Sequence, residues 1–193
     1  MRTIGLIKKK TLIPALWIAA FTFVVGLFFS LGLESFIRAI ESATFSFIAL
    51  LVVILTGIVF DAIGTAAAAA ESVPFNSMAA RRVPGAHQAV RIVRNADLVA
   101  NVTADVVGDI AGTLSGAVGA VIVVALMKQF PAVNVVLLGA TMTSLIASAT
   151  VGGKTIGKSL AINHANAIIL RVGKLMKVWE DATGMELLQG GRR

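Results

Sequence analysis

Four long apolar runs divide the chain, and short polar segments separate them. The runs fall at 11–33, 43–70, 98–127 and 134–153. Each run has at least the roughly 20 residues that an α-helix needs to cross a hydrocarbon core of about 30 Å. The pattern predicts an all-α integral membrane protein with four transmembrane helices.

Two further segments, 72–96 and 156–180, are too polar to cross a membrane. Both repeat apolar residues at three- and four-residue spacing, which indicates amphipathic helices. Pro84-Gly85 predicts a break inside the first segment. In the second, Trp179 on the apolar face is typical of an anchor at the membrane interface. We expect both segments to lie on the membrane surface as juxtamembrane helices.

The distribution of basic residues predicts the orientation of the chain. Basic residues precede the first run, lie between the second and third, and follow the fourth, whereas the two other loops hold only Arg38 and Lys128. Lys and Arg collect on the cytoplasmic side of membranes. We therefore expect a cytoplasmic N-terminus at 1–10, a single transmembrane domain at 11–180 and a cytoplasmic tail at 181–193, in a multi-pass protein of the cell membrane. Cleavage of the first run as a signal peptide is the competing interpretation.

Composition narrows the classes of function. The 193 residues are 57% hydrophobic and 14% charged, which is more apolar than a single soluble core of this length requires. The net charge of +7 does not indicate nucleic acid, because the basic residues flank apolar runs. The absence of Cys excludes disulfides and thiolate metal sites, and two His make an imidazole cluster improbable. Without a nucleophile–base pair or an HExxH-like motif, we do not expect an enzyme.

Three aspartates inside the predicted spans carry the strongest chemical signal. Asp61 lies in the second span, and Asp105 and Asp109 lie one helical turn apart in the third. An ionised Asp at the bilayer centre costs about 2.5–3.5 kcal/mol, so three of them need compensation. Mg²⁺ would provide it, because it prefers carboxylate, carbonyl and hydroxyl oxygens. A proton relay and Na⁺ fit the same groups.

Neutral polar side chains in the spans complete the predicted metal site. They are Asn101, Thr65, Ser115 and Thr150. Purely structural roles are the alternative, because Ser and Thr in spans usually bond their own helix. Asp105 or Asp109 could also be protonated or pair with Lys154, and so hold helices together.

Glycines recur in the last two spans. In the third span, positions 108, 112 and 116 form a small-xxx-small pattern, which favours close helix contacts within or between subunits. In the fourth, Gly152-Gly153 could interrupt the helix and expose backbone carbonyls.

Four stretches, at 60–66, 79–97, 105–110 and 153–158, carry a family resemblance. The first reads Phe-Asp-Ala-Ile-Gly-Thr-Ala, and the last reads Gly-Lys-Thr-Ile-Gly-Lys. From the second span onward the chain resembles the transmembrane domain of the CorB/CorC and cyclin-M (CNNM) magnesium transporters. The Asp-Val-Val-Gly-Asp-Ile stretch at 105–110 is similar to small CorB-like proteins of the clostridial type that lack CBS domains.

The resemblance implies a homodimeric Mg²⁺ transporter with Mg²⁺ bound as its substrate ion. Where the family has a Glu in its last span this chain has Thr150, and where the first motif has a Glu it has Gly64. Displaced carboxylates, those of Asp61, Asp105 and Asp109, would then take over ion binding. Regulation by ATP through CBS domains is not expected.

We therefore expect a transporter of divalent cations, with Mg²⁺ as the leading substrate and alternating access around an acidic cavity formed by the three aspartates. The expected partners are the lipid bilayer and a second copy of the chain. The alternative is a membrane scaffold or accessory subunit in which the aspartates are structural.

Overall fold

The computed structural model describes residues 9–40 and 43–188, and this part of the chain is helical almost throughout and contains no strand. In chain order the elements are α1 (Lys9–Ile40), α2 (Ala43–Ala69), α3 (Ser72–Ala80), α4 (Ala86–Arg94), α5 (Ala96–Ala100), the π-helix η1 (Asn101–Val107), α6 (Gly108–Gln129), α7 (Val135–Asn163) and α8 (Ala165–Thr183). The predicted all-α class is confirmed.

Four helical stretches of the described residues are long and apolar enough to cross a membrane. They cover Leu16–Leu33, Thr44–Ala69, Ala96–Gln129 and Val135–Asn163. The third stretch is continuous through α5, η1 and α6. The prediction of four spans is therefore confirmed at the level of helix length and composition.

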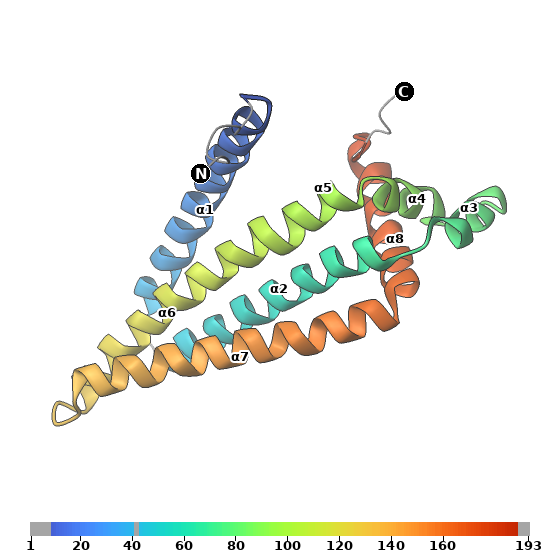
Figure 1. Ribbon diagram of the computed structural model, residues 1–193. Helices are drawn as coiled ribbons and strands as arrows, with labels where there is room; N and C mark the ends of the chain where they lie inside the picture. The colour runs from blue at the N-terminus through green and yellow to red at the C-terminus, as the bar shows by residue number, and fades with distance from the viewer. Residues whose placement is uncertain (1–8, 41–42, 189–193) are drawn as a thin grey trace, which may run out of the picture.

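α2 lies between α6 and α7 and packs against both (Figure 1). Glycines on the facing surfaces allow the close approach. A Cβ added to Gly57 would lie 2.9 Å from the Ala111 Cβ on α6, and one added to Gly157 would lie 3.1 Å from the Ile58 side chain on α2. Contacts this short leave no room for a side chain, so the small residues determine how closely the helices pack.

The expected interruption at Gly152-Gly153 is absent. α7 continues to Asn163, and α8 begins only at Ala165 instead of near residue 156. Helical glycine costs about 1 kcal/mol relative to Ala, but Gly153 faces the Ile58 side chain and lets α2 approach. As a result Lys154 lies inside the fourth long helix and not beyond its end.

α3, α4 and α8 form a group at one end of the long helices, and α8 lies across the ends of α2 and α7 (Figure 1). Their shared core includes the fully buried side chains of Phe75, Ile92 and Ile169. The predicted break at Pro84-Gly85 is present, because α3 ends at Ala80 and α4 begins at Ala86. Gly85 has a φ of 82°, a conformation that glycine adopts without strain.

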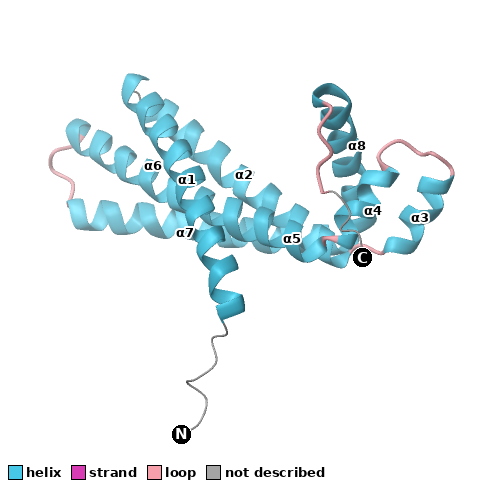
Figure 2. Ribbon diagram, turned by 90° about the horizontal axis from the view of Figure 1, so that it is seen from above, coloured by secondary structure: helices cyan, strands magenta, loops and turns pink. Residues whose placement is uncertain are grey.

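α1 diverges from the other long helices. Its N-terminal end lies away from them in both views (Figures 1 and 2), and no residue of Leu16–Leu33 is buried. It crosses α6 where Gly26 meets the Ile110 side chain, with 3.8 Å between an added Cβ and Ile110 Cγ1. Most of the surface of Leu16–Leu33 is therefore free to contact lipid or another chain.

Candidate functional site

Asp61 is a buried acid in the middle of the packed helices. It lies on α2, eight residues before the end of the helix at Ala69, and only 4% of its surface is exposed. At 1.5 Å per residue it is about 12 Å from that end. Its Oδ2 is buried and has no hydrogen-bond partner. An ionised carboxylate in such surroundings requires a positive charge.

Lys158 on α7 supplies that charge. Its Nζ lies 3.6 Å from Asp61 Oδ1, and 52% of its side chain is exposed, against 5% for Asp61. This separation is longer than the 2.7–2.9 Å of a strong charge-assisted hydrogen bond. The pair is therefore loose, with its lysine open to the surroundings and its carboxylate enclosed.

Lys154, one helical turn earlier, brings a second ammonium group to the same region. Its Nζ lies 3.3 Å from the position that a Cβ on Gly108 would occupy, so it lies against α6 where that side chain is missing. Among the residues that the structure describes, Lys154 makes no ion pair. The alternative of a Lys154 pair with Asp105 or Asp109 is not seen among these residues.

The three predicted hydroxyl ligands differ in whether they already make a hydrogen bond within the protein. Thr65 donates to the Asp61 carbonyl oxygen at 2.9 Å, and Ser115 donates to the Ala111 carbonyl oxygen at 2.8 Å. Both hydroxyl protons are thus used within their own helices. The Thr150 Oγ1 is buried and has no partner. Of the three hydroxyl oxygens, only that of Thr150 resembles the Asp61 carboxylate oxygen in being buried without a hydrogen-bond partner.

Asp105 and Asp109 lie outside the interface that encloses Asp61. Both are exposed, and neither carboxylate makes a hydrogen bond or ion pair within the described part of the chain. Asp109 lines a hollow of about 630 Å³ between α1 and α6, together with Thr22 and Thr113. Asn101, at the start of η1, is exposed as well.

Helix geometry explains why the acids do not meet. A Cβ on Gly64 of α2 would contact Ala104, and Gly108 lies close to Gly57. Asp105 follows Ala104 on η1, and Asp109 follows Gly108 on α6, each by one position, which turns each acid side chain by roughly 100° from the contact. Within 9–40 and 43–188 no group of three or more Asp, Glu or His side chains could hold a metal ion. The expected cavity of three converging carboxylates is therefore not seen in this part of the chain.

The two lysines were not predicted as site residues, because the fourth span was expected to end before them. A usable signal is nevertheless present in Gly-Lys-Thr-Ile-Gly-Lys at 153–158. Its four-residue repeat places both glycines on one helix face and both lysines on the adjacent one. The glycines contact α2 at Ile58 and Ala62, so the lysines necessarily lie at the edge of that contact.

Comparison with models of protein families, with curated proteins and with solved structures gives no match to this chain.

Proposed function

We propose that this chain is a membrane transporter of divalent cations, with Mg²⁺ as its leading substrate and Asp61 as the central ligand. The observation that carries the proposal is the buried Oδ2 of Asp61, which has no partner inside a helix bundle of membrane-spanning length. Intramembrane carboxylates of this kind mark ion pathways more often than not. Mg²⁺ keeps several waters and needs only one or two protein carboxylates, so a single enclosed Asp is a sufficient anchor.

Lys158 would act as an exchangeable counter-ion. When no Mg²⁺ is bound, its ammonium group neutralises Asp61 at 3.6 Å, and its exposed side chain allows it to swing away when the cation arrives. Transport requires an ion to bind strongly enough to enter and weakly enough to leave. A lysine that competes for the carboxylate lowers the affinity for the cation and favours release.

The family resemblance supports the same site. Two of the four resembling stretches, 60–66 on α2 and 153–158 on α7, contribute Asp61 and Lys158, and they face each other across the α2–α7 interface. Homodimer formation belongs to this proposal. Gly112 and Gly116 have open space around an added Cβ, which leaves a small-residue face of α6 free for a second copy.

A membrane scaffold or accessory subunit is the second candidate. The Asp61–Lys158 ion pair favours it, because a carboxylate that is already neutralised needs no metal ion. In that case the pair would only hold α2 against α7.

Lys158→Gln separates the two candidates. It removes the competing charge and leaves Asp61 in place. If Lys158 competes with Mg²⁺, the variant binds Mg²⁺ about tenfold or more tightly, and millimolar Mg²⁺ raises its Tm in detergent more than that of the wild type. If the pair is structural, the variant has a lower Tm and Mg²⁺ does not restore it.

Asp61→Asn completes the design, with the exposed Asp97→Asn on α5 as the matched control. The proposal expects Asp61→Asn to abolish both the Mg²⁺-dependent rise in Tm and Mg²⁺ flux into vesicles that contain the purified protein. The control should keep both. Flux that survives Asp61→Asn, or a wild type with no Tm response to Mg²⁺, Mn²⁺, Co²⁺ or Na⁺, would exclude Asp61 as a transport ligand.

A further inference from the structure

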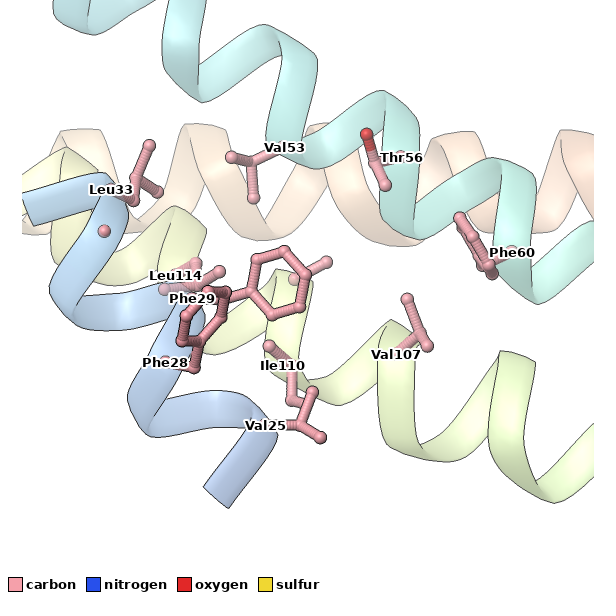
Figure 3. A pocket seen from close by; sticks show the side chains of 12 residues that line it. Val25, Phe28, Phe29, Leu33, Val53, Thr56, Phe60, Val107, Ile110 and Leu114 are labelled. Carbon is pink, nitrogen blue, oxygen red and sulfur yellow. The ribbon is translucent and has the colours of Figure 1, made fainter. Parts of the chain in front are cut away.

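An apolar cavity of about 730 Å³ lies between α1, α2 and α6. Figure 3 shows that α1 contributes Phe28 and Phe29, α2 contributes Val53, and α6 contributes Ile110 and Leu114 to its walls. The two phenylalanine rings stand nearly perpendicular, with centroids 5.8 Å apart, in an edge-to-face arrangement. Three different helices thus line one space that is open on one side, since Phe28 and Phe29 are 75% and 55% exposed. Its volume falls in the range of about 300–1,000 Å³ that small-molecule sites occupy.

The chemistry of the walls excludes a polar ligand. Thr56 is the only lining residue with a polar side chain. Its hydroxyl donates to the Val52 carbonyl oxygen at 2.8 Å, so its proton is not available to an occupant. The cavity wall contains no charged side chain that could pair with a phosphate or a metal ion.

The position of the cavity along α2 indicates which part of a membrane would surround it. Thr56 lies 12 residues from Thr44 and 13 from Ala69 within the apolar stretch of α2. At 1.5 Å per residue this is roughly 18–20 Å from either end, near the middle of a hydrocarbon core about 30 Å thick. Only the acyl chains of lipids, and not their headgroups, reach this depth.

The shape of the space favours a lipid chain over a protein helix. The space is open on one side, so a transmembrane helix, about 10–12 Å across with its side chains, could insert only side chains into it. A hydrocarbon chain is thinner and flexible. We infer that the cavity binds one acyl chain of a membrane lipid, without selection for the headgroup.

Gly32 offers a direct way to fill the cavity. It lines the space, and a Cβ added there would have no neighbour within 4 Å. Gly32→Phe should therefore occupy the cavity without disturbing the helix contacts. Gly139 on α7 is the matched control, because it also has no neighbour within 4 Å of an added Cβ and it does not line the cavity. Val53→Phe fills the space from α2 and serves as the second variant if Gly32→Phe does not fold.

The experiment is native mass spectrometry of the purified protein in detergent, after incubation with palmitoyl-oleoyl phosphatidylcholine or with phosphatidylglycerol of the same chains. We expect the wild type and Gly139→Phe to retain one lipid per chain with either headgroup. The filled variants should retain about tenfold less. Equal lipid retention by a folded, filled variant would overturn the inference. Retention of phosphatidylglycerol alone would also overturn it, since the headgroup would then be recognised. So would a dimer without lipid that Gly32→Phe dissociates, because the occupant would then be a second copy.

Discussion

Arg91 and Glu180 form a largely buried ion pair that joins α4 to α8 outside the spans, and Glu180→Gln tests what it contributes to stability. Arg91 Nη2 donates to Glu180 Oε1, and both side chains are 10% exposed. The carboxylate also accepts hydrogen bonds from Gln88 Nε2 at 2.9 Å and from the Leu187 amide at 3.0 Å. Glu180 therefore accepts three hydrogen bonds from described residues.

The expected cost follows from what remains when the charge is removed. Removing one partner of a buried pair typically costs 3–5 kcal/mol, because the other charge is left uncompensated. Here Glu186 Oε2 lies 3.6 Å from Arg91 Nη1 and is 67% exposed, so it compensates part of the arginine charge. Gln also keeps an oxygen that accepts a hydrogen bond. We expect Glu180→Gln to lower the free energy of unfolding by about 2–3 kcal/mol.

Trp179 provides the assay, because it precedes Glu180 on α8. In a Trp17→Phe background it is the one remaining tryptophan of the chain, and its fluorescence reports the local unfolding of α8 during a denaturant titration in detergent. Asp181→Asn is the matched control, since Asp181 is exposed and adjacent. It should change stability by less than about 0.5 kcal/mol.

Two results would refute this reasoning. The first is a change for Glu180→Gln no larger than that for Asp181→Asn. The second is additivity in a double-mutant cycle of Arg91→Met and Glu180→Leu, because side chains in direct contact should show a coupling of at least about 0.5 kcal/mol. Either result would mean that α4 and α8 are held by their apolar contacts alone.

Three further predictions concern the stability of the folded helices. Burial alone would raise the pKa of Glu180, but its hydrogen bonds and the adjacent arginine hold that pKa below the ordinary 4.5. The stability that the ionised carboxylate contributes is complete above pH 4.5 and is lost as the pH falls through the folded-state pKa. Acid should therefore destabilise the wild type more than Glu180→Gln, as followed by Trp179 fluorescence. Gly173→Ala should destabilise the protein by about 1–3 kcal/mol, because the new Cβ would collide with the Gly85 carbonyl oxygen. Gly152→Ala has open space around its Cβ and should stabilise the protein by up to about 1 kcal/mol. Thermal melts in detergent compare the two variants. Asn134→Ala should cost about 1 kcal/mol in the same melts, since its side chain caps two amides at the start of α7.

The candidate site could be predicted only in part from the sequence. Asp61 stands out as an acid within an apolar run, and no tertiary information is needed to see that it is unusual. Its partner Lys158 was hidden, because a glycine pair and two lysines look like the end of a span. In the structure α7 continues through them, and Gly153 and Gly157 pack against α2.

The placement of Asp105 and Asp109 also depends on tertiary packing. Their periodicity correctly places them on one helix face, one turn apart. It does not say whether that face is turned toward α2. The structure directs Ala104 and Gly108 to the interface and leaves both acids exposed.

By itself the sequence determined the all-helical class, the four stretches of membrane-spanning length and the break at Pro84-Gly85, because these depend on local periodicity and on the backbone preferences of single residues. Only the tertiary structure decided that Asp61 meets Lys158, that α1 stands apart and leaves an apolar cavity, and that Arg91 meets Glu180. Those outcomes depend on which face of each helix packs against a neighbour, and steric fit between helices distant in sequence sets that choice.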